Sequence, residues 1–382
     1  MHREDEALHN FGGDRVVDLQ RGESRSNRST VMCPKCRLVL SAEAVFCREC
    51  GFKLPDKTDQ LFKSLSERIK RPILKSEREA FTLALEMLER GDFITWCVDH
   101  INKYHAGDTT LARLLLVSAL RVSFHSSSAL LHYSVTGASG SGKSDLYEKI
   151  CAIIPSNHLE VMTSVTPQVL YYATLSESND GQRVTNPEAF SGKVIVVTEI
   201  NDSRSFSALK AFAEQSEIST FTHKVTIGGT AKDLIVRGAR AVFCASVMPI
   251  NDEQAANRFI DVSISKSDMQ AKVDKAALAC SNVLNEATIE TDPQSDIAKA
   301  GVELLMSGDS EFEEPTEEVK QLVKDTSAAM TVRGISLRKV KQLYSLAQCC
   351  AVEKSWRRGE LRVEVEDVKE ACELLKPWLV VE

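Results

Sequence analysis

The sequence lacks any apolar run long enough to cross a membrane, and its first residues, MHREDEALHN, lack the features of a signal peptide. A spanning helix needs about 20 consecutive apolar residues. We therefore expect no membrane partner and a cytoplasmic location. The chain also lacks an excess of positive charge, because 54 acidic residues outnumber 47 lysines and arginines and give a formal net charge of −7. An overall basic surface for nucleic acid is excluded, but a local basic patch is not.

The length of 382 residues and a hydrophobic content of 43% allow two or three domains with a sizeable core. No internal repeat is present. Periodicity and composition divide the chain into a polar, disordered tail (1–30), a cysteine module (31–54), a helical segment (55–125), an α/β segment (126–266), a helical connection with an acidic linker (267–318) and a C-terminal helical segment (319–382).

The cysteine module contains two C-x-x-C pairs, ten residues apart. Its ligands would be Cys33, Cys36, Cys47 and Cys50. Two such pairs complete a tetrahedral thiolate site suited to Zn²⁺, and a stretch this short would need the metal in order to fold. We expect a small zinc ribbon with a hairpin between the pairs. Redox-active pairs or two disulfides are the alternatives, and the ribbon could contact DNA, contact a protein or only stabilise a terminus.

A phosphate-binding loop is the most specific motif of the chain. GASGSGKS matches G-x(4)-G-K-[ST], follows an apolar strand-like run and precedes a helical pattern. Backbone N–H groups of such a loop converge on the phosphates of a nucleotide, the lysine reaches the β- and γ-phosphates, and the Ser144 hydroxyl ligates Mg²⁺. The residues expected to bind ATP are Gly137, Ala138, Ser139, Gly140, Ser141, Gly142, Lys143, Ser144 and Asp145.

Short apolar runs alternate with helical segments after residue 126, which predicts a parallel α/β sheet. One run, KVIVVTEI, ends in Thr198 and Glu199, where Asp-Glu is commoner. Glu199 is expected to polarise the attacking water. Thr198 replaces the aspartate that usually contacts Mg²⁺ at this position. The sequence therefore does not determine how fast ATP is hydrolysed. The alternative for Glu199 is a structural role at a strand end.

Two further residues are candidates for catalysis. Ser246 ends the apolar run ARAVFCASV and would orient the water or the γ-phosphate. Arg258 precedes the next strand-like segment and could reach the nucleotide of a neighbouring subunit. An ordinary surface arginine is the alternative.

The order of these motifs resembles that of AAA+ ATPases, and in particular the minichromosome-maintenance-helicase-like (helix-2-insert) clade. SVTPQVLYYATL (164–175), Asn257-Arg258 and the C-terminal TVR and VEVEDVKEACELL segments are similar to motifs of that clade. The resemblance covers about 125–265 and 325–380. It implies a hexameric ring of identical subunits with ATP between them, and a C-terminal helical lid whose Arg333 is a second sensor. Thr198 and the lack of a match to the large N-terminal DNA-binding collar are departures.

A hairpin is expected within STFTHKVTIGGTAKDLIVRGAR (219–240), where two β-prone runs flank Gly228-Gly229. Its basic residues include Lys224, Lys232 and Arg237. The resemblance implies that this hairpin projects into the ring channel and grips DNA phosphates, which would let an acidic chain bind a polyanion. An edge hairpin with solvated lysines is the alternative. A second loop, 176–190, corresponds to the insert of that clade.

Together these features predict an ATPase that uses Mg²⁺ and moves on single- or double-stranded DNA, as a helicase or replication protein of a cellular, plasmid or viral element. A DNA loader or initiator with slow hydrolysis and a protein remodeller that does not bind DNA are the rivals. A small-molecule kinase is disfavoured, because such kinases lack the sensor arginines, the hairpin and the lid.

Overall fold

The computed structural model describes residues 30–32, 35–37, 39–41 and 48–50 and most of residues 57–379. Between 57 and 379 the residues outside the description are 125–129, 167–174, 178–182, 187, 201–205, 207–208, 210–212, 214–219, 228–229, 238–240, 251–252, 265–268, 286–287, 308–310 and 333–335. The tail up to residue 29, Cys33, Cys47, Gly228, Gly229 and Arg333 thus lie outside the described residues. The chain divides into two compact units, Met1–Leu61 and Phe62–Glu382.

The described part of the first unit contains a short antiparallel hairpin. Strand β1 (Thr30–Met32) pairs with β2 (Val39–Ser41), and Thr30 lies opposite Ser41. The residues that join the two strands include the first C-x-x-C pair. The predicted hairpin between the two cysteine pairs includes residues 42–47, which lie outside the described residues, and it stays a prediction.

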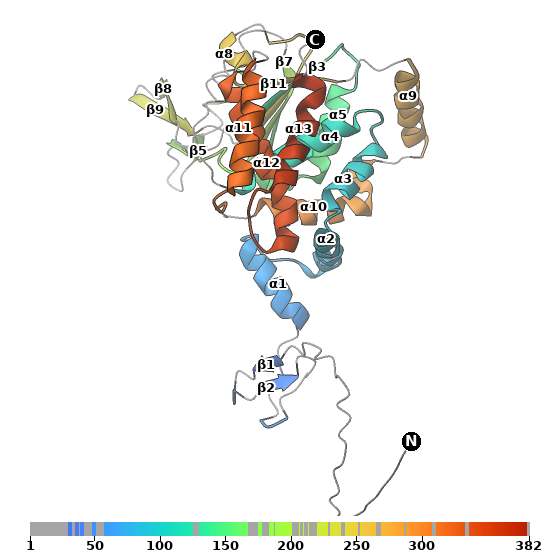
Figure 1. The fold of residues 1–382 in the computed structure, drawn as a ribbon, viewed down its shortest axis with the longest axis vertical. Helices are drawn as coiled ribbons and strands as arrows, with labels where there is room; N and C mark the ends of the chain where they lie inside the picture. The colour runs from blue at the N-terminus through green and yellow to red at the C-terminus, as the bar shows by residue number, and fades with distance from the viewer. Residues whose placement is uncertain are drawn as a thin grey trace, which may run out of the picture. The chain divides into compact units, whose positions relative to one another are not determined.

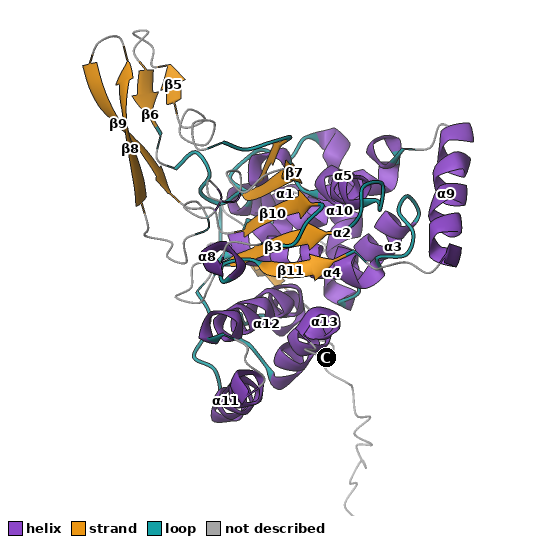
Figure 2. Ribbon diagram, turned by 90° about the horizontal axis from the view of Figure 1, so that it is seen from above, coloured by secondary structure: helices purple, strands orange, loops and turns teal. Residues whose placement is uncertain are grey.

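A parallel sheet of five strands forms the centre of the second unit (Figure 2). Its order is β11-β3-β10-β7-β4, and every adjacent pair is parallel. The strands are β3 (Leu131–Thr136), β4 (Leu159–Met162), β7 (Val194–Ile200), β10 (Ala241–Ser246) and β11 (Ile260–Ser263). The strands predicted from the apolar runs are confirmed, and so is the α/β class.

The central strands are buried on both faces, as continuous apolar runs require: β3 and β10 at every position and β7 over Val194–Val197. Alternate residues of β7 point to opposite sides, with Val194 and Val196 in a large core and Ile195 and Val197 in a smaller one. The large core extends from Phe62 to Leu375 and includes side chains of the helices that precede and follow the sheet. Segments 55–125 and 319–382 therefore share one core with the sheet.

Helices surround the sheet (Figure 1). They are α1 (Lys57–Arg68), α2 (Arg78–Arg90), α3 (Phe93–Asn102), α4 (Thr109–Ala119), α5 (Lys143–Ile153), α8 (Glu253–Ala256), α9 (Met269–Leu284), α10 (Pro293–Met306), α11 (Glu317–Val332), α12 (Leu337–Arg358) and α13 (Val365–Leu379). Short 3-10 turns occupy Lys75–Glu77, Leu120–Ser123, Ser156–His158 and Ile289–Thr291. α12 and α13 contact β3 and β11, respectively. Among the described residues, none of these helices combines the length and apolar character needed to cross a bilayer.

Two antiparallel hairpins project from the same side of the second unit (Figures 1 and 2). One consists of β5 (Leu175–Glu177) and β6 (Arg183–Thr185), within the predicted insert. The longer one consists of β8 (Thr220–Ile227) and β9 (Thr230–Arg237), with Ile227 opposite Thr230. This confirms the predicted hairpin. Since β9 ends only four positions before β10 begins, the hairpin lies at the amino end of β10.

His132 is a buried titratable group in the middle of the sheet. Its side chain is fully buried on β3, and neither ring nitrogen has a hydrogen-bond partner among the described residues. The ring lies 5.5 Å from that of Phe259. Burial, together with the positive charges of Arg121 and Arg258, lowers the pKa of His132 to about 3. The imidazole is therefore neutral in the folded protein at neutral pH.

His132 should make the fold sensitive to mild acid. Because its pKa is lower in the folded than in the unfolded state, its contribution to stability is lost as the pH falls below about 6.5, by about 1.4 kcal/mol per pH unit. The variant His132→Leu should lose less stability than the wild type between pH 6.5 and 4.5, as measured by urea unfolding at several pH values. Equal pH dependence in the two proteins would contradict this prediction.

Candidate nucleotide-binding site

The phosphate loop occupies residues 137–142, between the end of β3 and the start of α5. Gly140 and Gly142 have φ angles of 74° and 95°, in the left-handed region that favours glycine. Gly137 is closely approached, since a Cβ there would lie 2.6 Å from Cγ2 of Ile264. The strand–loop–helix context required by the motif is thus present, and the N-terminus of α5 directs its free N–H groups into the loop.

Lys143 is buried and its ammonium group lies inside the loop. Its Nζ donates to the carbonyl oxygens of Gly137 at 2.6 Å and Ala138 at 2.8 Å, and approaches Oγ of Ser141 at 3.5 Å. Burial lowers the pKa of Lys143. The loop carbonyls thus keep the Lys143 ammonium group where it could donate to the phosphates of a nucleotide.

Ser144 and Thr198 line one cavity of about 450 Å³ beside α5. The pairing of β10 with β7 shifts at this point, because Cys244 is opposite Val197 whereas Ser246 is opposite Ile200. The extra residue makes a bulge at the end of β7, a feature that redirects side chains near active sites. Ser144 of α5 and Thr198 of β7 thus line the same cavity, and the Thr198 hydroxyl donates to the carbonyl of Thr163 at 3.5 Å. Thr198 occupies the position where a carboxylate is usual.

Glu199 is exposed one position beyond Thr198, at the end of β7. Ser246 ends the neighbouring β10, and its carbonyl oxygen accepts from the N–H of Gly137 at 3.3 Å. Its hydroxyl donates to the carbonyl of Met248 at 2.7 Å and accepts from the N–H of Met248 at 3.2 Å. Ser246 is thus next to the loop, but its side chain is engaged by its own turn.

Arg258 lies at the amino end of the parallel strands, whereas the phosphate loop lies at their carboxyl end. It precedes β11 by two positions, and β11 runs parallel to β3, whose far end carries the loop. Its NH1 group donates to the carbonyl of Gln254 at 3.1 Å, and its own carbonyl accepts from Gln342 of α12 at 2.8 Å. This arginine is not positioned to contact the nucleotide of its own chain. Arg333 lies outside the described residues.

The cations predicted to contact DNA lie along the β8–β9 hairpin. Lys224 is exposed and its register partner is Asp233, while Lys232 is opposite Val225 and Arg237 is opposite Thr220. Positions 224 and 237 thus belong to one face of the hairpin and position 232 to the other, because successive positions of a strand alternate. The predicted contacts of these cations with DNA would therefore involve both faces of the hairpin.

The predicted zinc site falls largely outside the described residues. Cys36 is exposed in a turn and Cys50 is half-buried, whereas Cys33 and Cys47 are not described. Within the described portion of the chain there is no group of three or more His, Cys, Asp or Glu side chains that could hold a metal ion. The four-cysteine site stays a prediction.

Sequence reasoning missed a charged cluster at the phosphate loop. His105 contacts both Asp145, the residue after Ser144, and Asp108, while Lys275 of α9 contacts Asp108 and the carbonyl of Ser141. These residues come from three separate segments. The acidic residue after the Lys-Ser pair is the only sequence signal for the cluster, and nothing in the pattern of 269–284 distinguishes Lys275 from a solvated lysine.

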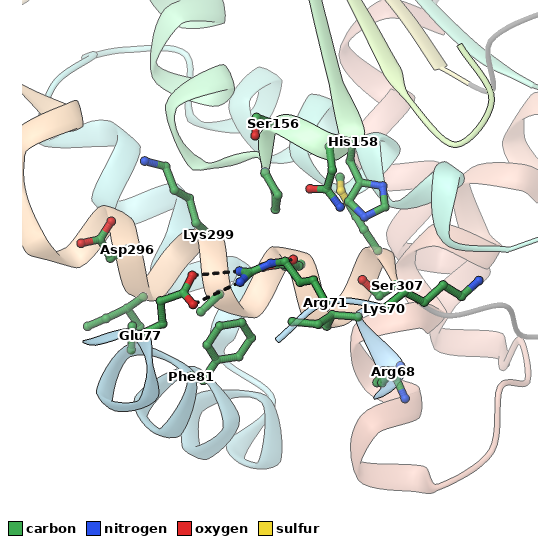
Figure 3. A pocket seen from close by; sticks show the side chains of 18 of the residues that line it. Arg68, Lys70, Arg71, Glu77, Phe81, Ser156, His158, Asp296, Lys299 and Ser307 are labelled. Carbon is green, nitrogen blue, oxygen red and sulfur yellow. Dashed lines mark hydrogen bonds and ion pairs between the residues drawn. The ribbon is translucent and has the colours of Figure 1, made fainter. Parts of the chain in front are cut away.

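A large cavity lies elsewhere in the described part of the chain (Figure 3). It has a volume of about 1120 Å³ between α1, α2, α10 and the turn before β4. Arg71 lies within it and is held by Glu303 at 2.6 Å and by Glu77 at 3.0 Å. Because two carboxylates already neutralise this arginine, the cavity is not an evident phosphate site, and the loop remains the candidate.

Comparison with known proteins agrees with this assignment. A family model described as MTBMA_p00010 P-loop domain matches residues 78–298, which is more than half of the chain. The match begins at α2 and ends within α10, so it includes helices before and after the sheet. A protein of Methanothermobacter marburgensis, named "Uncharacterized protein MTBMA_p00010", is 32% identical over 74 residues. That alignment covers 19% of this chain and 9% of the relative.

Removing the Lys143 ammonium should strongly impair nucleotide binding. Charge-assisted hydrogen bonds to phosphate contribute several kcal/mol, so we expect Lys143→Ala to raise the Kd for a fluorescent ATP analogue by roughly 100-fold. Lys193→Ala is the matched control, because Lys193 pairs with Glu160 at the other end of β7. Similar Kd values for wild type and Lys143→Ala, measured by fluorescence titration, would show that the nucleotide does not bind at this loop.

Proposed function

Because the chain belongs to the MTBMA_p00010 P-loop domain family, we propose that it is an oligomeric AAA+-type ATPase that binds DNA and moves along it by hydrolysing ATP. Its role would be that of a helicase or replication protein of a cellular, plasmid or viral element. The observation that carries the proposal is the β8–β9 hairpin, which is inserted between β7, the strand that contains Glu199, and β10, the strand that ends in Ser246.

The residues at the carboxyl edge of the sheet support ATP hydrolysis. The sheet order puts β10 between β3 and β7, so its end is flanked by the phosphate loop and by Glu199. In the proposed mechanism Lys143 would bind the β- and γ-phosphates and Ser144 would hold Mg²⁺, whose charge would stabilise the transition state. Glu199 polarises the attacking water. Ser246 orients the water once its hydroxyl leaves the backbone of Met248.

The position of Arg258 supports a ring-shaped oligomer. It lies at the amino edge of the sheet, whereas the loop lies at the carboxyl edge, so a contact between Arg258 and a nucleotide requires a neighbouring copy. We propose a homo-oligomer, most simply a hexamer, in which Arg258 of one subunit stabilises charge on the ATP of the next. Arg333, the second sensor of the resemblance, and a lid made of α11 to α13 belong to the same proposal, as does a zinc ribbon held by Cys33, Cys36, Cys47 and Cys50.

A DNA loader or initiator with slow hydrolysis is the second candidate. Thr198 favours it, because a hydroxyl binds Mg²⁺ and its water more weakly than the carboxylate usual at this position. Strand displacement on a forked duplex separates the two, since a helicase releases the displaced strand in proportion to ATP consumed and a loader does not.

A contribution of Arg258 to a neighbour's site should make ATPase activity depend on protein concentration. We expect the specific rate of the wild type to rise as subunits assemble, and Arg258→Ala to lower it by roughly 10³-fold, the effect of removing an arginine finger. Phosphate release is measured over a concentration series. Arg90→Ala, which removes an exposed arginine paired with Asp92, should behave as wild type. A rate independent of concentration and of Arg258 would refute the ring.

DNA binding should depend on the hairpin. Lys224→Ala should weaken binding of a labelled single-stranded oligonucleotide and reduce the salt dependence of the affinity by about one unit of slope for each phosphate that is no longer neutralised. Fluorescence anisotropy over a range of NaCl concentrations measures both. Lys376→Ala, on the exposed side of α13, is the control. An unchanged affinity and slope for Lys224→Ala would favour the protein remodeller.

A further inference from the structure

The cluster at the phosphate loop is built around a buried histidine. His105 is 2% exposed, and each of its ring nitrogens faces a carboxylate. Nδ1 lies 2.5 Å from Oδ2 of Asp145 and Nε2 lies 2.9 Å from Oδ2 of Asp108. Lys275 forms an ion pair with the same oxygen of Asp108. Two cations and two carboxylates therefore pair, with His105 and Asp108 buried at the centre and with Asp145 and Lys275 reaching the surface.

The charge of His105 follows from these partners. Burial lowers the pKa of His105, but the hydrogen bonds to Asp108 and Asp145 outweigh burial, and the net shift is upward. Burial raises the pKa of Asp108, and its bonds to His105 and Lys275 more than offset that effect. Each member of the cluster thus depends on the others, because a buried charge without its partner is costly.

The cluster supports the outer side of the phosphate loop. Nζ of Lys275 donates to the carbonyl of Ser141 at 3.4 Å. A Cβ added to Gly142 would lie 3.1 Å from Cε1 of His105 and 3.6 Å from Nζ of Lys275. The peptide unit between Ser141 and Gly142 is therefore in contact with both cations, on the side away from the N–H groups that receive phosphate.

Lys275 belongs to α9, a helix with little apolar burial from residue 273 onward. α9 lies at the outer edge of the second unit in both views (Figures 1 and 2), and none of its side chains from 273 to 284 is buried. Val273, Val283 and Leu284 are 52%, 77% and 83% exposed. Since apolar burial does not hold this part of α9 in place, its ionic contacts with Asp108 and the loop contribute to its attachment.

We propose that Lys275 is a positioning residue for the nucleotide site, which couples occupancy of the phosphate loop to the attachment of α9. A nucleotide that orders the Ser141–Gly142 peptide also orders the carbonyl that Lys275 binds. By thermodynamic reciprocity, the attachment of α9 through Lys275 favours nucleotide binding by the same factor. This inference rests on the proposed function only in that the loop binds a nucleotide; it needs neither DNA nor a ring.

The test compares nucleotide affinity and the dynamics of α9 in the full chain. We expect Lys275→Ala to raise the Kd for a fluorescent ATP analogue with Mg²⁺ by about tenfold, the lower end of the effect of removing a residue that orients a metal ligand. Lys275→Arg, which keeps the charge and the donors, should restore most of the affinity. Nucleotide should slow amide hydrogen exchange of α9 in the wild type and in Lys275→Arg, but not in Lys275→Ala.

Two controls separate positioning from folding. Lys324→Ala changes an exposed lysine of α11 and should leave both readouts as in the wild type. Because Lys275→Ala leaves Asp108 with one cation fewer, the double variant Asp108→Asn, Lys275→Met removes both charges together. It should keep the thermal unfolding temperature of the nucleotide-free protein and still lose the exchange response of α9.

Two results would overturn the inference while leaving the nucleotide site intact. One is an unchanged Kd in Lys275→Ala. The other is a weaker Kd with a normal exchange response of α9, which would mean that only loop stability was reduced. Failure of the wild type to bind the analogue at all would overturn both this inference and ATP binding. A protein that does not bind DNA, or whose ATPase rate does not depend on Arg258, would contradict only the proposed motor function.

Discussion

The position of β3 is the constraint on which the rest of the molecule depends. This strand is buried at every position and hydrogen-bonds to β10 on one side and β11 on the other. The phosphate loop follows directly after its carboxyl end. Because the pairing is parallel, the carboxyl ends of β7 and β10 lie at the same end of the sheet as the phosphate loop. Thr198, Glu199 and Ser246 therefore lie on the same side of the sheet as the loop, although they are distant from it in sequence.

Parallel pairing also separates two kinds of function. The carboxyl edge carries the phosphate loop and the residues proposed for hydrolysis. The amino edge carries Arg258 and the β8–β9 hairpin, since both immediately precede a strand. In an assembly of identical subunits the amino edge of one copy would meet the carboxyl edge of another. This arrangement would let a change at the nucleotide reach the hairpin of a neighbour through rigid strands.

Buried polar groups show how closely the helices before and after the sheet are tied to it. His105, from the connection between α3 and α4, pairs with Asp145 in the first turn of α5. Gln342 of α12 donates to the carbonyls of Leu130 and Arg258, which precede β3 and β11. Removing either partner of such a contact costs stability, which makes the helices part of the nucleotide unit and not an accessory to it.

The sequence by itself determined the local features. Continuous apolar runs such as Val194–Val197 can be satisfied only in a sheet covered on both faces, and GASGSGKS after one of them specifies a phosphate loop, because its glycines must adopt left-handed backbone angles. Gly-Gly between β-prone runs was sufficient to predict the β8–β9 hairpin. These signals act over a few residues, so they can be recognised in the chain alone.

Only the tertiary structure decided which strands and side chains are neighbours. Strand order, the bulge that redirects Thr198 and Glu199, and the register that puts Lys224 and Lys232 out of phase all depend on hydrogen bonds between distant segments. Lys275 looks like any solvated lysine until α9 brings it to Asp108 and Ser141. Its charge matters because burial of Asp108 and His105 removes the water that would otherwise screen them, and burial is a property of the folded chain.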